Sequence, residues 1–186
     1  MKKNLVNLLL FCALALVLSG AYFLYGKLGD KVKSDSYPQE QQEEEEKKAA
    51  DFTVYDDEQN PLKLSDFAGK PVIVNFWASW CPPCRSEMPH FEEAFSAYGG
   101  DIVFLMVNLT DGASETVSSA REFIEMQAYT FPIYFDTDFS ASNAYEISSI
   151  PATYFIDPSG NIAAHYLGSL SKEALEVRID LIFPEK

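Results

Sequence analysis

The sequence predicts an α/β fold in which helices flank a mixed β-sheet. Strand-like runs alternate with helical patterns along residues 49–186, an order typical of an α/β sandwich. Two runs, Val72–Trp77 and Ile102–Val107, are almost continuously apolar, as strands buried on both faces are. A cysteine pair, Cys81 and Cys84, follows the first run and precedes a helical pattern. We therefore expect the central strand to deliver the cysteines at its C-terminal end.

The predicted domain begins with a β-hairpin. Phe52–Tyr55 alternates in polarity, and a turn-rich stretch separates it from a short returning strand at Leu62–Leu64. After the cysteines, a helical pattern runs from Arg85 to Tyr98, where Gly99 and Gly100 end it. Pro89 lies inside this pattern and is expected to kink the helix. The apolar residues that recur on its buried face are Met88, Phe91, Phe95 and Tyr98.

The rest of the domain continues the alternation. The expected elements are a helix over Ser114–Gln127, a strand at Pro132–Phe135, a short helix at Ser140–Tyr145, a hairpin of Thr153–Ile156 with Asn161–Leu167, and a final helix capped by Ser171. Gln127 is placed on the buried side of the first of these helices, and Leu175, Ile179 and Ile182 on that of the last. The predicted order is ββ-βα-βα-βα-ββ-α.

The net charge of −14 belongs to the C-terminal domain. Residues 1–48 contain seven basic and seven acidic residues, so residues 49–186 carry seven basic against 21 acidic ones. Such a surface repels phosphate backbones, and we therefore expect no nucleic-acid partner.

The N-terminus is predicted to be a targeting segment. An apolar run from Leu5 to about Tyr25 is long enough to span a bilayer, so residues 1–26 are expected to form a transmembrane anchor. A signal peptide is the alternative, because Ser19-Gly20-Ala21 resembles a cleavage site. Residues 27–48, which include QEQQEEEEKK, are expected to be a charged flexible linker.

The spacing of Cys81 and Cys84 favours a redox pair. The first thiol would lie at a helix N-terminus, where free N–H groups and the helix dipole favour a thiolate. The second would follow one turn later, close enough to attack the first. A metal site is disfavoured, because His90 and His165 are the only histidines and no second CxxC is present. We expect no cofactor beyond a Cys81–Cys84 disulfide.

Two longer motifs carry a family resemblance. VNFWASWCPPCRSEMP, followed about 65 residues later by IPATYFIDPSGNI, resembles the membrane-anchored thioredoxin-like thiol–disulfide oxidoreductases of the TlpA/ResA family. The likeness extends from roughly Leu64 to Phe183. It implies a thioredoxin fold with an extra N-terminal β-hairpin.

The resemblance also implies roles for individual residues. Cys81 would be the exposed nucleophile and Cys84 the buried resolving thiol. Pro151, preceded by Ile150, matches a cis-proline beside the disulfide that lets a substrate chain pair with the neighbouring backbone. Trp80 matches the aromatic residue that shields the pair.

Two positions depart from thioredoxin itself. Its buried aspartate corresponds to Asn75, so the implied proton-transfer role moves to Glu87 or to a water; alternatively, Glu87 only complements the helix dipole. Pro82 and Pro83 have no N–H groups, which leaves the Cys84 N–H as the nearest donor to a Cys81 thiolate.

The function implied by the resemblance is reduction of disulfides on the extracytoplasmic side of the cell membrane. The implied clients are exported proteins such as apocytochrome c or methionine sulfoxide reductases, and the implied electron donor is a transmembrane protein of the CcdA/DsbD type. Two alternatives stay open: an oxidase that forms disulfides in exported proteins, and a non-catalytic copper-binding module that uses His165.

Overall fold

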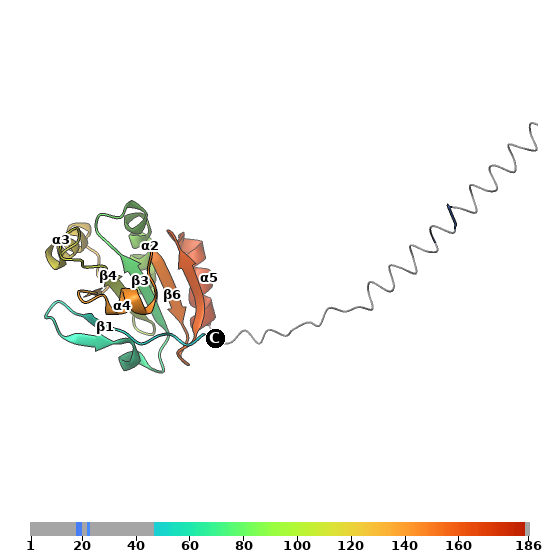
Figure 1. The fold of residues 1–186 in the computed structure, drawn as a ribbon, viewed down its shortest axis with the longest axis horizontal. Coiled ribbons are helices and arrows are strands. Elements are labelled where there is room, and N and C mark those ends of the chain that lie inside the picture. The colour runs from blue at the N-terminus through green and yellow to red at the C-terminus, as the bar shows by residue number, and fades with distance from the viewer. Residues whose placement is uncertain (1–17, 20–21, 23–46, 185–186) are drawn as a thin grey trace, which may run out of the picture. The chain divides into compact units, whose positions relative to one another are not determined.

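Strand β3 (Val72–Trp77) has the predicted bounds and lies inside a seven-stranded mixed sheet in the computed structural model (Figure 1). The structure describes residues 18–19, 22 and 47–184. All six residues of β3 are buried. The strand pairs in parallel with β4 (Val103–Asn108) and antiparallel with β6 (Ala152–Ile156). Its C-terminal end is therefore held on both sides.

The sheet order is β2-β1-β5-β4-β3-β6-β7. The remaining elements, in chain order, are β1 (Thr53–Tyr55), β2 (Pro61–Lys63), the 3₁₀ helix η1 (Leu64–Phe67), α2 (Pro82–Tyr98), α3 (Val117–Gln127), β5 (Ile133–Phe135), α4 (Ser140–Ala144), β7 (Ile162–Leu167) and α5 (Lys172–Ile182). The predicted order of strands and α-helices is confirmed.

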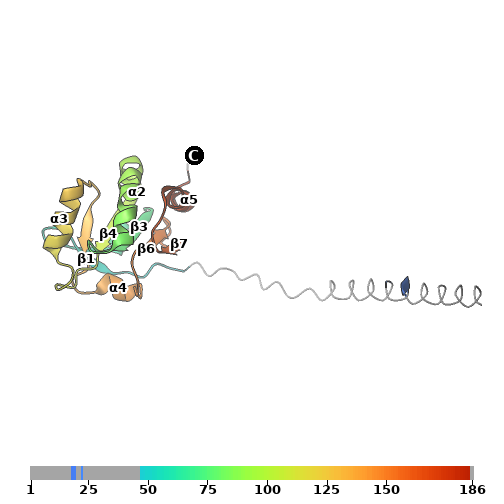
Figure 2. The same cartoon turned by 90° about the horizontal axis from the view of Figure 1, so that it is seen from above.

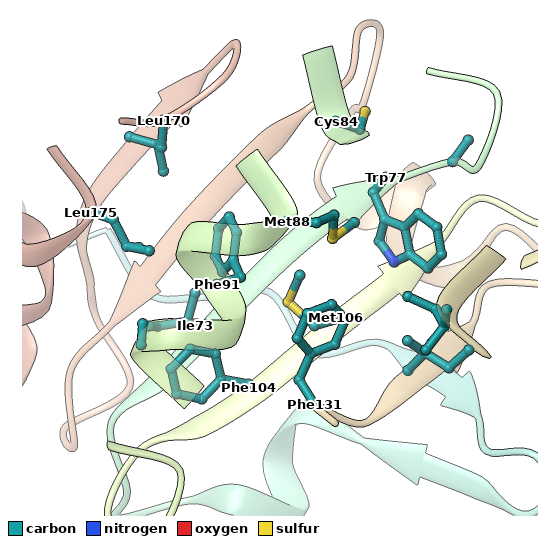
Figure 3. Packing of buried hydrophobic residues seen from close by; sticks show 14 of the residues in the cluster. Ile73, Trp77, Cys84, Met88, Phe91, Phe104, Met106, Phe131, Leu170 and Leu175 are labelled. Carbon is teal, nitrogen blue, oxygen red and sulfur yellow. The ribbon is translucent and has the colours of Figure 1, made fainter. Parts of the chain in front are cut away.

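Two hydrophobic clusters fill the two faces of the sheet. The larger cluster lies between the sheet and helices α2, α3 and α5, and the smaller one lies on the face covered by α4. Figure 2 shows α2, α3 and α5 on one side of the sheet and α4 on the other. In Figure 3, Met88 of α2 lies beside Trp77 and Met106 of the sheet, and all three side chains are fully buried. Burial of this kind supplies most of the stability of the domain.

Helix α2 begins three residues before the predicted pattern. Pro82 and Pro83 occupy its first two positions, where a missing N–H group costs no hydrogen bond. The helix continues through Pro89. Of the predicted apolar face, Met88 and Phe91 are fully buried, whereas Phe95 and Tyr98 are partly buried.

Three predicted details are wrong. Leu64 is not the end of β2 but the first residue of η1, where Asp66 accepts a hydrogen bond from the Lys63 N–H at 2.8 Å. Helix α3 starts at Val117 rather than at Ser114, because Thr116 caps it and the preceding residues form a separate turn. Gln127, the last residue of α3, is exposed rather than buried.

The predicted anchor and linker fall largely on residues 1–46, outside the described part of the chain except for residues 18–19 and 22. Among the residues that the structure describes, no helix is both long and apolar enough to cross a membrane. Lys47 and Lys48, at the end of the predicted linker, already pair with the β6–β7 turn. The Lys47 carbonyl accepts from the Ile162 N–H at 2.8 Å, and Lys48 bridges to Asn161.

The burial of the side chains on α2 predicts which of two substitutions lowers the stability of the domain more. Phe91→Ala should reduce the free energy of unfolding by about 3–5 kcal/mol, because it leaves a cavity at a fully buried position. Phe95→Ala, on the same helix but partly exposed, should cost less. Urea unfolding of the oxidised protein measures both values. Equal losses would contradict the packing described here.

Candidate active site around Cys81 and Cys84

The cysteine pair lies where β3 gives way to α2. Cys81 is the N-cap residue of α2, and Cys84 lies in its first turn. A disulfide joins them, with their Cα atoms 5.3 Å apart. The Cys84 N–H donates to Cys81 Sγ at 3.3 Å, as predicted for the nearest donor. The helix therefore directs one N–H group at the sulfur that would carry a thiolate charge.

Cys81 is less exposed than predicted. It is 3% exposed and Cys84 is 0% exposed, so the expectation of an exposed nucleophile is wrong for this disulfide form. The physical reason is the loop that ends at Pro151: the Ile150 carbonyl oxygen lies 3.8 Å from Cys81 Sγ. The Ile150–Pro151 peptide bond is cis, the isomer that the family resemblance implies.

An apolar hollow of about 420 Å³ opens beside Cys81. Trp80 is 55% exposed and lines this hollow together with Cys81. The residues around the hollow are Trp80, Cys81, Pro82, Pro83, Leu109 and 147–150. The hollow lies between Trp80 and the loop before the cis-proline, and Cys81 is part of its lining.

Glu87 is fully buried in α2, three residues after Cys84, and accepts two hydrogen bonds. The Asn75 side chain donates from Nδ2 to Glu87 Oε1 at 2.9 Å, and the Leu170 N–H donates to Oε2 at 2.8 Å. Asn75 Nδ2 also donates to Thr153 Oγ1 at 3.0 Å. The two positions weighed separately in the sequence, Asn75 and Glu87, thus form one buried network that joins β3, β6, α2 and the segment before α5.

Burial raises the pKa of Glu87 from 4.5 to about 7, against the opposing effect of the hydrogen bonds from Leu170 and Asn75. Glu87 is the sixth residue of α2, beyond the first turn. Its burial and its partners argue against a surface residue that only complements the helix dipole. A carboxyl group that titrates near neutral pH can take up or release a proton beside the cysteines.

A second buried carboxylate, Glu115, was missed in the sequence. It contacts Ser79 and Asn108 next to the active-site turn. The position of Asn108 could have indicated that it lies near the active site. It ends β4 opposite Trp77, and the ends of parallel strands meet at one edge of a sheet. Glu115 lies in a polar loop, where no sequence pattern indicates that it is near the active site.

Within the described part of the chain, no three His, Cys, Asp or Glu side chains gather as a metal site. His165 stacks on the ring of Tyr154, with the centroids 5.8 Å apart.

A redox disulfide at the end of a central strand, a cis-proline beside it and this sheet order define a thioredoxin-like thiol–disulfide oxidoreductase. The comparisons agree. Residues 46–165 match the AhpC/TSA family. Over 99% of its length the chain is 31% identical to thiol-disulfide oxidoreductase ResA of Geobacillus kaustophilus, all of which is covered.

Solved structures extend the likeness. StoA from Bacillus subtilis is 27% identical with a TM-score of 0.60, over 70% of this chain and 96% of that one. The exposed lipoprotein thioredoxin Etrx1 from Streptococcus pneumoniae is 28% identical with a TM-score of 0.61, over 70% of this chain and 99% of that one. The chain belongs to the AhpC/TSA family and, within it, to the ResA-like thiol–disulfide oxidoreductases. The predicted fold class and family resemblance are confirmed.

The raised pKa of Glu87 predicts a pH-dependent stability. The folded state binds this proton more tightly than the unfolded state does, so the contribution of Glu87 to stability is greatest below about pH 4.5 and is lost as pH rises through about 7. The shift corresponds to about 3 kcal/mol. Glu87→Gln, which keeps the size but has no charge, should remove this part of the pH dependence.

Urea unfolding of the oxidised protein between about pH 4 and pH 8 measures this contribution. Glu122→Gln, at an exposed position of α3, is the matched control and should follow the wild-type profile. Parallel profiles for the wild type and Glu87→Gln would contradict the assignment.

Proposed function

We propose that this oxidoreductase works as a reductant of disulfides in exported proteins, on the extracytoplasmic side of the cell membrane. The observation that carries the direction is the weak support for a thiolate at Cys81. Among the described residues, one N–H group, that of Cys84, is hydrogen-bonded to Cys81 Sγ, and the next two helix positions are prolines. A pair whose reduced form gains little stabilisation is a reductant, just as a pair whose reduced form is stabilised is an oxidant.

The charges near the pair support the same direction. Arg85 follows Cys84, but its guanidinium lies over the ring of Phe123, 5.2 Å from the centroid. Glu87, three residues after Cys84, is buried and becomes negative as it loses its proton. A nearby negative charge disfavours a thiolate.

The proposed reaction is a two-step thiol–disulfide exchange. The Cys81 thiolate attacks one sulfur of the substrate disulfide, forming a mixed disulfide and releasing the other substrate sulfur as a thiolate, which takes up a proton. Cys84 then loses its proton and attacks Cys81 Sγ, which releases the second substrate thiol. The substrate gains two electrons and two protons, and the Cys81–Cys84 disulfide forms.

Glu87 is proposed to accept the proton from Cys84 in the second step. Its pKa of about 7 suits a group that takes a proton at neutral pH and returns it when the pair is reduced again. Its hydrogen bonds to Asn75 and Leu170 hold the carboxyl group in place.

The partners follow from the chemistry. A reductant in an oxidising compartment needs a dithiol donor, and we propose a transmembrane thiol carrier of the CcdA/DsbD type. An N-terminal anchor would keep the domain near that donor. The proposed clients are exported proteins such as apocytochrome c or methionine sulfoxide reductases, whose disulfide-bearing segments would lie along the apolar hollow beside Cys81.

The Cys84→Ala variant tests this function by trapping clients in the native host. It should accumulate mixed disulfides through Cys81, because the resolving thiol is missing, while the double variant with Cys81→Ala should trap nothing. The wild-type pair should be mostly reduced in the cell. A mostly oxidised pair would indicate the oxidase instead, and an absence of mixed disulfides would overturn the catalytic role.

The reduction potential gives a second test. With weak stabilisation of the thiolate, the pair should equilibrate nearer to about −270 mV than to about −120 mV, the limits observed for thioredoxin-like proteins. Equilibration with a dithiol buffer of known ratio measures it. A value at the oxidising end would contradict the proposed direction.

A further inference from the structure

A second buried carboxylate holds the turn that carries Cys81. Glu115 lies between β4 and α3 and is 0% exposed. Its Oε1 accepts from the Ser79 N–H at 3.1 Å and from Asn108 Nδ2 at 2.8 Å. Its Oε2 is 2.8 Å from the Ser79 hydroxyl, which donates to it. Both carboxylate oxygens therefore accept hydrogen bonds from the active-site turn, and Oε1 also accepts one from the end of the neighbouring strand.

The loop that bears Glu115 is organised in advance for this contact. Asp111 Oδ1 accepts from three successive N–H groups, those of Ala113, Ser114 and Glu115, at 2.7–2.9 Å. The Gly112 N–H donates to the Glu115 carbonyl at 2.9 Å. Gly112 has a φ of 74°, a left-handed conformation that glycine adopts without a steric penalty. The side chain is thus placed by its own loop and not by the disulfide.

The same cluster connects the disulfide to the wall of the hollow. Ser79 precedes Cys81 by two residues, and the Cys81 N–H donates to the Ala78 carbonyl at 3.2 Å. Leu109, which lines the hollow, follows Asn108 directly, and its N–H donates to the Trp77 carbonyl at 2.9 Å. Glu115 therefore joins the turn before the nucleophile to the strand end that carries part of the substrate wall.

The hydrogen-bond partners of Glu115 are neutral. They are one backbone N–H, one hydroxyl and one amide. The two ion pairs seen among the described residues, Arg121–Asp57 and Lys172–Glu93, do not include it. A carboxylate held away from water acts on its surroundings with little screening. Its charge therefore opposes a negative charge on Cys81, which follows the Glu115 partner Ser79 by two residues.

We propose that Glu115 is a positioning residue for thiol–disulfide exchange, which holds the Cys81 turn through Ser79 and disfavours the Cys81 thiolate by its charge. This role deepens the proposed function, on which it rests. It makes the reduced pair less stable relative to the disulfide, and the protein a stronger electron donor. Glu87 would accept and return the proton of Cys84, whereas Glu115 would raise the free energy of the Cys81 thiolate.

The experiment compares Glu115→Gln with Glu122→Gln in the full chain. Glutamine keeps the carbonyl acceptor for Ser79 N–H and Asn108, and its amide can donate to the Ser79 hydroxyl, so the hydrogen-bonded frame is retained while the charge is lost. Glu122→Gln removes the same charge from an exposed position on α3. Glu87 and Arg85, the charged side chains on the turn that bears Cys84, are unchanged in both variants.

Two quantities are measured: the redox equilibrium of the pair with glutathione, and the pKa of Cys81 from its thiolate absorbance. Glu115→Gln should shift the equilibrium about fivefold toward the dithiol, which corresponds to about 20 mV, and should lower the pKa of Cys81. Glu122→Gln should change the equilibrium less than about twofold. Glu115→Ala should in addition slow the reduction of a peptide disulfide, because the turn loses its two hydrogen bonds through Ser79 and Asn108 loses a third.

A glutathione equilibrium and a Cys81 pKa that are the same in Glu115→Gln and Glu122→Gln would overturn the proposal, even if both Glu115 variants unfold more easily. If Glu115→Ala does not fold, the Gln variant decides the question by itself. The pair equilibrates with glutathione whatever its natural client. Failure of the Cys84→Ala trap would therefore remove the proposed function and leave this test intact.

Discussion

The structure depends on the complete burial of β3, a strand that is hydrogen-bonded on both edges and covered on both faces. This strand carries one polar side chain, Asn75, into the core, where an unpaired polar group costs free energy. Asn75 therefore bonds to Glu87 and Thr153. The Asn75 Nδ2 group donates to both, and its contact with Glu87 also holds that carboxyl group in place. One contact therefore serves both the packing of β3 and the proposed proton transfer.

The surroundings of the pair determine its chemistry more than the CxxC spacing does. A helix N-terminus favours a thiolate at Cys81. The prolines that follow remove donors, and two buried carboxyl groups, Glu87 and Glu115, approach the active-site turn from different elements. In the proposed function, these features weaken the stabilisation of the reduced pair. The same spacing with donors and cations around it would give an oxidant.

The proposed substrate site lies on one side of the disulfide. The loop before the cis-proline packs against Cys81 through the Ile150 carbonyl, and Trp80 and Leu109 line the adjacent hollow. A substrate that binds there would bring its disulfide in beside an apolar wall. An extended segment with apolar residues next to its cysteines would fit this arrangement better than a folded, charged surface, because the acidic domain offers few basic contacts.

The sequence by itself determined the strand bounds of β3, the order of the elements and the redox pair, since each depends on local periodicity or on a contiguous motif. The start of α2 was misplaced, because the prolines that begin it carry no helical periodicity. Only the tertiary structure decided the contacts of Glu87 with Leu170 and of Glu115 with Ser79, which join residues 83 and 36 positions apart. Such contacts arise from the packing of separate elements, and no local pattern encodes them.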